Sequence, residues 1–72
     1  MRVEIDPHCQ RRMRERGISP EDMAIAWTAY EKDTASQDHP TARVRTGRRP
    51  DGSPVTVVAE VRGDCLYFWT TW

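Results

Sequence analysis

Hydrophobic and polar residues alternate in three parts of the chain and follow a helical period in another. Residues 2–5 read Arg-Val-Glu-Ile, which suits a short half-buried strand, and residues 42–46 and 55–62 alternate in the same way. Residues 65–72 continue with β-branched and aromatic side chains and predict the last strand. A helix is predicted after residue 20, where apolar side chains recur every three or four positions: Met23, Ala26, Trp27 and Tyr30.

Capping residues set the ends of two predicted helices. Asp6 and Pro7 supply an N-cap and a proline at the first helical position. Gly17 suits the left-handed residue that ends a helix near Arg16. Ser19 begins a second helix, because Ser-Pro-Glu-Asp places an acidic side chain three residues after an N-cap. The two predicted helices therefore follow each other directly.

Turn residues organise the rest of the chain. Residues 31–40 are polar and aperiodic and predict a connecting loop, and residues 47–54 predict a second loop with a Pro-Asp-Gly turn. Gly63 and Asp64 predict a two-residue hairpin turn. Such a turn sets the cross-strand pairs, which run outward from the turn as Arg62 with Cys65, Val61 with Leu66, Glu60 with Tyr67, Ala59 with Phe68 and Val58 with Trp69.

This register divides the predicted sheet into two faces. The apolar face is the expected core, covered by both helices, and holds Val55, Val57, Ala59, Val61, Leu66, Phe68 and Trp72. The opposite face, termed the outer face, holds Thr56, Val58, Glu60, Arg62, Cys65, Tyr67, Trp69 and Thr71. If Val44 points into the core, Arg43 and Arg45 join the outer face.

The expected fold is α+β in the order β-α-α-β-β-β, with two N-terminal helices packed on one face of a small antiparallel sheet. The length of 72 residues allows one domain, 1–72. Two cysteines, no signal peptide and no long apolar run indicate a reduced, cytoplasmic protein without a membrane segment. Because Cys9, Cys65, His8 and His39 lack the spacing of a zinc site, we expect neither a metal nor a cofactor.

Charges are balanced overall but unevenly distributed. Eleven basic residues, ten of them arginine, balance eleven acidic ones. Residues 1–16 hold five arginines and three acids, residues 17–40 hold one lysine and five acids, and residues 41–49 hold four arginines and no acid. Either these blocks form a bipolar surface that binds a polyanion, or they neutralise one another in the fold.

The first helix carries a candidate catalytic band. At about 100° per residue, His8, Arg12, Glu15 and Arg16 lie along one side of it, and the candidate catalytic residues are His8, Arg12 and Arg16. An imidazole can move a proton near neutral pH, and guanidinium groups can stabilise the extra negative charge of a phosphodiester transition state. The structural alternative is that Glu15 pairs with Arg11 or Arg12, while the last arginine interacts with the helix C-terminus.

The outer face is a candidate nucleic-acid-binding surface. Arg43 and Arg45 would contact phosphates. Tyr67 and Trp69 would offer rings on which bases stack. Two other arrangements of these rings stay open, namely a dimer or partner interface, or cover by the 31–41 loop.

The N-terminal motif resembles that of a known family. His8, Arg12, Met13 and Arg16, followed by Gly-Ile-Ser, are similar to the opening of a family of short bacterial proteins of unknown function within the RelE/ParE/BrnT-like toxin superfamily. The similarity is close over residues 8–30 and looser over 42–72. It implies a RelE-like helix pair on a sheet. For characterised toxins it also implies ribonuclease activity on mRNA, often at the ribosome, with a cognate antitoxin as partner. ParE-like members act on gyrase instead, so the fold alone does not give the substrate.

The leading hypothesis is therefore a toxin-like endoribonuclease that cleaves mRNA as one component of a toxin–antitoxin pair. His8 would be the acid/base, and Arg12 and Arg16 would stabilise the phosphate. The strongest alternative is a non-catalytic module that binds a protein through its aromatic sheet face or an edge strand, and a homodimer is compatible with both. A DNA-binding or regulatory role comes third, because no recognition helix stands out.

Overall fold

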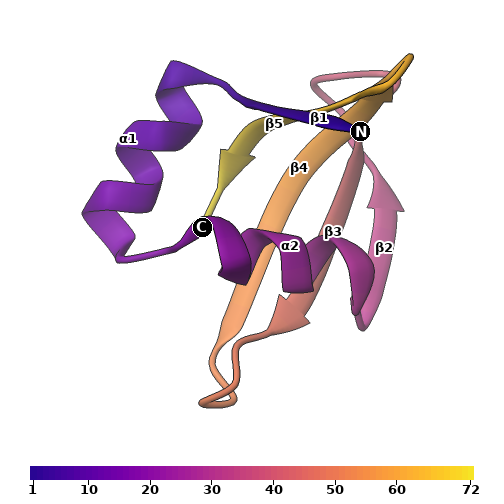
Figure 1. Cartoon of the computed structure of the whole chain (residues 1–72). Coiled ribbons are helices and arrows are strands. Elements are labelled where there is room, and N and C mark those ends of the chain that lie inside the picture. Colours follow the sequence, from indigo (N-terminus) through magenta and orange to yellow (C-terminus); the bar gives the residue numbers. More distant parts are fainter.

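The computed structural model describes all 72 residues. The elements are β1 (Arg2–Ile5), α1 (Pro7–Arg16), α2 (Pro20–Thr28), β2 (Lys32–Ala35), β3 (Arg43–Arg48), β4 (Pro54–Arg62) and β5 (Cys65–Thr71). The strands form one mixed sheet in the order β1-β5-β4-β3-β2, in which β1 runs parallel to β5 and all other neighbours are antiparallel. Both helices lie on the same side of this sheet (Figure 1). Neither helix is long and apolar enough to cross a membrane.

Both predicted helix boundaries are confirmed. Helix α1 ends at Gly17, which has a φ of 64°, and the Ile18 N–H donates to the carbonyl of Met13 at 2.9 Å. Helix α2 begins with a capping box, in which Ser19 and Asp22 exchange two side-chain-to-backbone hydrogen bonds of 3.1 Å. These local contacts satisfy backbone groups at the junction and place the two helices in close succession.

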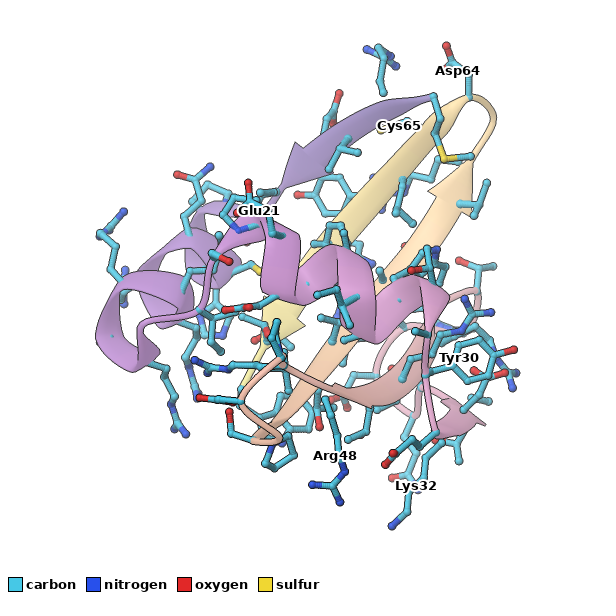
Figure 2. All side chains as sticks on the ribbon, turned by 60° about the horizontal axis from the view of Figure 1, so that its bottom comes forward. Glu21, Tyr30, Lys32, Arg48, Asp64 and Cys65 are labelled. Atoms are coloured by element: carbon cyan, nitrogen blue, oxygen red, sulfur yellow. The ribbon has the colours of Figure 1, made fainter.

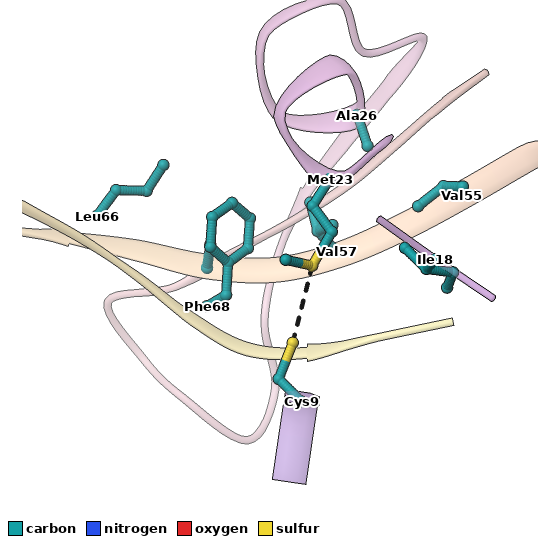
Figure 3. Close-up of a cluster of buried hydrophobic side chains, with 9 residues drawn as sticks. Cys9, Ile18, Met23, Ala26, Val55, Val57, Leu66 and Phe68 are labelled. Atoms are coloured by element: carbon teal, nitrogen blue, oxygen red, sulfur yellow. Dashed lines mark hydrogen bonds between the residues drawn. The ribbon is translucent and has the colours of Figure 1, made fainter. Parts of the chain in front are cut away.

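The helices and the sheet share one core. The Cys9 thiol of α1 lies 3.8 Å from the Met23 sulfur of α2, so the two helices meet above the sheet (Figure 3). Trp27 packs edge-on against Phe68, with ring centroids 6.5 Å apart. The buried cluster comprises Cys9, Ile18, Met23, Ala26, Val55, Val57, Ala59, Leu66 and Phe68. The expected core face is therefore confirmed for its five central sheet residues.

The predicted β4–β5 register is confirmed near the turn and wrong beyond it. The pairs run as expected from Arg62–Cys65 to Ala59–Phe68, but Val58 then pairs with Thr70. Trp69 is left without an opposite residue, which is a β-bulge, and the side-chain alternation shifts by one after it. Thr71, expected on the outer face, is therefore fully buried, and Trp72, expected in the core, is 47 % exposed. Val61 was also expected in the core but is 54 % exposed, although its pairing with Leu66 is as predicted.

The sheet has more strands than predicted and is not wholly antiparallel. Strand β2 lies within the segment 31–40 that was expected to be a loop, and it pairs with β3 along the edge of the sheet. An edge strand with mostly exposed residues needs no alternation of apolar side chains, so its sequence lacks the usual signal. Strand β1 pairs with β5 in parallel, an arrangement that needs a long connection, and here the connection includes both helices and the three other strands.

Strand β3 is turned the opposite way from the expectation. Arg45 pairs with Val57 and therefore lies on the helix-covered face, whereas Val44 points to the outer face. The reason is Gly47, which is buried in β3 rather than in the predicted loop. A Cβ atom at Gly47 would lie 2.9 Å from the Cα atom of Ala26, so only glycine fits beneath α2. With Gly47 facing α2, the alternation of the strand turns the residues two and four positions before it to the same face.

The segment 36–42, termed the 36–42 loop, continues from β2 onto the outer face. It is a compact turn in which the His39 N–H donates to the Ser36 hydroxyl at 3.2 Å and the Ala42 N–H donates to the His39 carbonyl at 2.9 Å. Ala42 is 1 % exposed. Its His39 ring stacks on Trp69, so cover of an outer-face aromatic residue by this segment, one of the arrangements left open by the sequence, is present in the chain.

Candidate functional site

Helix α1 carries a concentration of positive charge that the fold does not neutralise. Six of the ten arginines form ion pairs with carboxylates, and the remaining four all lie on α1: Arg11, Arg12, Arg14 and Arg16. The pairing of Glu15 with Arg11 or Arg12, one part of the structural alternative, is not formed, whereas Arg16 does lie in the last turn of α1, where its charge can interact with the helix C-terminus. Helix α1 therefore presents free guanidinium groups within a protein whose net charge is zero.

The three residues proposed as catalytic lie on the accessible side of α1. His8 and Arg16 are exposed and Arg12 is half-buried. Their side chains make no hydrogen bond or ion pair within the chain, whereas Cys9, next to His8, points into the core. The imidazole and the two guanidinium groups are thus available to an external anion.

The second basic block, residues 41–49, is neutralised. Asp33 on β2 accepts from Arg43 at 3.1 Å and from Arg45 at 3.3 Å. The other two arginines of the block also have partners, Arg48 with Glu31 at 3.2 Å and Arg49 with Asp22 at 3.8 Å. Figure 2 shows Arg48 of β3 and Lys32 of β2 projecting outward from the protein. Of the two interpretations of the charge pattern, mutual neutralisation is confirmed for this block.

Arg45 has a structural duty. Its guanidinium donates to the Trp27 carbonyl at 2.9 Å and lies 3.9 Å from the Trp27 ring centroid and 4.4 Å from that of Tyr30. These contacts tie the end of α2 to β3. The two arginines also hold the pKa of Asp33 below its usual value, mainly through the hydrogen bond from Arg43.

The proposed grouping of Arg43 and Arg45 with Tyr67 and Trp69 on one face is wrong. The two arginines belong to the helix-covered face of β3, while Tyr67 pairs with Glu60 on the outer face. The reversal of β3 beneath Gly47 is the physical cause. The two arginines and the two aromatic side chains therefore lie on opposite faces of the sheet, so a ligand that binds one face cannot contact all four.

Asp6 connects α1 to the outer face. It stands between β1 and α1, where its carboxylate accepts hydrogen bonds from the backbone N–H of His8 at 2.9 Å and from the Tyr67 hydroxyl at 2.6 Å. The hydrogen bond from Tyr67 is the largest cause that lowers the pKa of Asp6, and the charges of His8 and His39 act in the same direction. Asp6 thereby joins the backbone at the start of α1 to the Tyr67 side chain.

The hydrogen bond between Tyr67 and Asp6 can be tested through the pKa of Tyr67. Because its hydroxyl donates to a carboxylate, the pKa of Tyr67 is raised above the ordinary value of 10.0. We expect Asp6→Asn, which retains an N-capping side chain, to lower that pKa toward its ordinary value. A tyrosinate absorbance titration of both proteins, with Tyr67→Phe to assign the transition, measures the change. Identical titrations of wild type and Asp6→Asn would contradict the contact.

An aromatic cluster lies on the outer face beside this contact. It consists of Tyr67, Trp69 and His39 together with Arg62. The His39 ring stacks on Trp69 with centroids 4.0 Å apart and planes 9° from parallel, and Tyr67 meets Trp69 edge-on at 4.8 Å. The Arg62 guanidinium lies 4.5 Å from the Tyr67 centroid and 4.9 Å from that of Trp69. Every ring in this cluster is therefore held by another ring or by a cation.

Glu60 fixes the aromatic cluster from below. This carboxylate is 7 % exposed and accepts from Thr41 and from the Trp69 indole N–H, both at 2.5 Å. Arg62 adds a third hydrogen bond at 3.2 Å. These hydrogen bonds lower the pKa of Glu60, and the one from Thr41 has the largest effect. Glu60 is therefore a buried anion whose two oxygens both have hydrogen-bond donors. It joins the 36–42 loop to the sheet.

Sequence reasoning missed the roles of Asp6, His39, Glu60 and Arg62. The hairpin register did place Glu60 and Arg62 beside Tyr67, and that was the one available signal. His39 was considered only as a zinc ligand with the cysteines, but Cys9 lies in the helix-side core and Cys65 pairs in register with Arg62 on the outer face. Burial, and next the charge of Asp6, raise the pKa of Cys9 to about 11, so this thiol stays protonated at neutral pH.

The structure offers an imidazole and free guanidinium groups on α1 and aromatic rings on the outer face of the sheet, with Asp6 between the start of α1 and Tyr67. Such groups can attract an anion, move a proton and stack on a flat ring.

Comparison of this chain with protein-family models, with curated proteins and with solved structures gives no match.

Proposed function

We propose that this protein is a toxin-like endoribonuclease that cleaves mRNA, one component of a toxin–antitoxin pair with a RelE-like helix pair on a sheet. The observation that carries the proposal is the segregation of charge: every arginine outside α1 is paired with an acid, and every arginine on α1 is free. Unpaired arginines are suited to phosphate, which they bind through two parallel hydrogen bonds. Their position beside an exposed histidine favours a phosphodiester substrate.

The chemistry assigned to these residues is acid/base cleavage of RNA. His8 takes the proton of the ribose 2′-hydroxyl, whose oxygen attacks the adjacent phosphorus while the bond to the 5′-oxygen breaks. Arg12 and Arg16 stabilise the additional negative charge that develops on the phosphate oxygens. The products are a 2′,3′-cyclic phosphate and a 5′-hydroxyl, with the proton delivered to the leaving oxygen.

Induced expression in a bacterial host tests this function. We expect the wild type to arrest growth and to cleave mRNA, and His8→Ala and Arg12→Ala to reduce cleavage by about 100-fold or more, since a positioned acid/base or charge-stabilising group contributes about that factor. Arg14→Ala is the matched control, because Arg14 is equally unpaired but lies about 200° around the helix from Arg12. Growth and mapped mRNA ends are the readouts.

Harmless expression of the wild type would count against the enzyme. Loss of cleavage in Arg14→Ala equal to that in Arg12→Ala would show that positive charge alone matters and would remove the specific role of the band. A co-expressed antitoxin that restores growth would support the toxin–antitoxin assignment.

One observation favours the second candidate, a protein-binding module. Strand β1 is an edge of the sheet, and next to it lies an open hollow of about 290 Å³ lined by Ile5, Gln10, Met13, Arg14 and Ile18. An added strand could pair with the free backbone of β1 and place an apolar side chain in the hollow. On the aromatic face, by contrast, the His39 ring lies on Trp69 and would have to move aside before a partner could bind there. Harmless wild-type expression, together with protection of β1 amides in a complex, would favour this function.

A further inference from the structure

We infer that Trp69 is a stacking platform for a base of single-stranded RNA, and that His39 occupies this platform in the free protein. The inference rests on the proposed function for the identity of the ligand. It adds a base-binding position that the α1 arginines do not supply. It also assigns His39 a role as an internal competitor for that position.

The geometry of the His39–Trp69 contact is that of a stacked base. The two ring planes deviate from parallel by 9°, and their centroids are 4.0 Å apart. A flat heteroaromatic ring therefore already lies where a pyrimidine or purine ring would lie on the indole. Stacking on an aromatic side chain tolerates any base, because every base has a π-face.

His39 can leave without disrupting the loop that carries it. The His39 backbone N–H and carbonyl make the hydrogen bonds of the turn, with Ser36 and Ala42, while the imidazole itself makes no hydrogen bond. A separate contact, from Thr41 to Glu60, anchors the loop to the sheet. Rotation of one side chain is thus enough to clear the indole.

Trp69, in contrast, is fixed in place. Its indole N–H donates to Glu60 at 2.5 Å, and the edge-on contact with Tyr67 supports the ring at 4.8 Å. The β-bulge leaves Trp69 without a cross-strand neighbour, so no side chain of β4 opposes it directly. A rigid platform with a removable cover needs little reorganisation when a ligand binds.

A cationic group lies beside this platform for a phosphate of the same strand. The Arg62 guanidinium is 4.9 Å from the Trp69 centroid, and it is ion-paired with Glu60 at 3.2 Å while its side chain stays 47 % exposed. A guanidinium carries five N–H donors, so Arg62 can bind a phosphate oxygen and keep its contact with Glu60. A strand with one base on Trp69 therefore has a charge partner next to that base.

Binding of an uncleavable oligonucleotide tests the platform separately from catalysis. The probe is a short, fluorescently labelled 2′-O-methyl oligoadenylate, which lacks the attacking hydroxyl. Its binding is measured by fluorescence anisotropy. We expect His39→Ala to bind about three- to tenfold more tightly than the wild type, because a competing aromatic pair is lost. Trp69→Leu should bind about 5- to 100-fold more weakly, and Trp69→Phe, which keeps a stacking ring, should stay close to the wild type.

The outcomes separate this inference from the proposed function. If both His39→Ala and Trp69→Leu bind the oligonucleotide like the wild type, the stacking platform is wrong, whether or not the protein cleaves RNA. Trp69→Phe is expected to bind like the wild type in either case. If affinities change as expected but no RNA is cleaved in cells, the platform stands and the enzyme fails. Equal binding of a deoxyadenylate of the same length would overturn the assignment to RNA. If Trp69→Leu does not fold, an unchanged affinity of His39→Ala is sufficient to reject the inference.

Discussion

Gly47→Ala should lower the melting temperature by about 8–16 °C. The added Cβ atom would meet the Ala26 Cα atom at 2.9 Å and the Ala29 carbonyl oxygen at 3.2 Å, and both atoms belong to the backbone of the α2 segment. Neither can move aside by a side-chain rotation, so α2 must shift from the sheet. Overpacking of this kind costs about 2 kcal/mol, and about 4–8 °C is lost per kcal/mol in a domain of this size. Thermal unfolding followed by circular dichroism measures the effect.

A second glycine provides the control for this prediction. Gly52 has a φ of 90°, and a Cβ atom there would have no neighbour within 4 Å. Gly52→Ala therefore strains only its own turn, whereas Gly47→Ala should also speed amide exchange in α2. Adding Ala26→Gly should not rescue Gly47→Ala, because the clash is with the Cα atom and not with the methyl group. Unchanged exchange in α2 would disprove the contact.

Glu60→Gln should lower the free energy of unfolding at pH 7 by about 1–3 kcal/mol. The Glu60 carboxylate accepts three hydrogen bonds, from Thr41, Trp69 and Arg62. An amide can keep its oxygen toward Trp69 and Arg62 and donate from its N–H₂ group to the Thr41 hydroxyl, but these hydrogen bonds then lose the charged acceptor that strengthens them in a site that is 7 % exposed. Urea unfolding measures the loss. Gln is close in shape to Glu, so a smaller change would show that the charge of the carboxylate is not needed.

The same variant should reduce the sensitivity of the fold to acid. The pKa of Glu60 is lower in the folded protein than its ordinary value of 4.5, mainly because of the hydrogen bond from Thr41. Its contribution to stability is therefore complete above about pH 4.5 and is lost as the pH falls through the folded-state pKa. The pKa values of Asp33 and Asp6 are lowered as well, so the wild type should lose stability throughout this window.

Urea unfolding at a series of pH values from neutral to acidic tests this dependence. The wild-type free energy of unfolding should fall more steeply below about pH 4.5 than that of Glu60→Gln, whose amide has no proton to bind there. Asp33→Asn serves as a comparison, because it removes a different carboxylate with a lowered pKa from the β2–β3 edge. Parallel curves for wild type and Glu60→Gln would contradict the role of the Glu60 carboxylate.

The candidate site could be predicted only in part. His8, Arg12 and Arg16 share a side of α1 for reasons of helical spacing alone, and the structure leaves them accessible. Their connection to the outer face depends on the hydrogen bond between Asp6 and Tyr67, which are 61 residues apart in the chain. No local pattern encodes a contact of that range. The stacking of His39 on Trp69 has the same character.

The sequence shows where basic and acidic residues are concentrated along the chain, but not which of them form ion pairs in the fold. The four arginines of residues 41–49 could either bind a polyanion or be neutralised within the fold, and Asp33, Glu31 and Asp22 neutralise all of them. Asp33 reaches Arg43 and Arg45 because β2 pairs with β3. That strand was not predictable from polar residues at a sheet edge. The uncompensated charge on α1 is accordingly a property of the tertiary structure.

By itself the sequence determined the two helices with their caps, the Gly63 hairpin with its first four cross-strand pairs, and the central apolar face of β4 and β5. Each of these depends on interactions between residues that are close along the chain or joined by a tight turn. The tertiary structure alone decided the direction in which β3 faces, the bulge at Trp69 and which arginines remain free. Those features depend on packing beneath α2 and on ion pairs between distant segments, where the fit of one glycine or the position of one aspartate outweighs local preference.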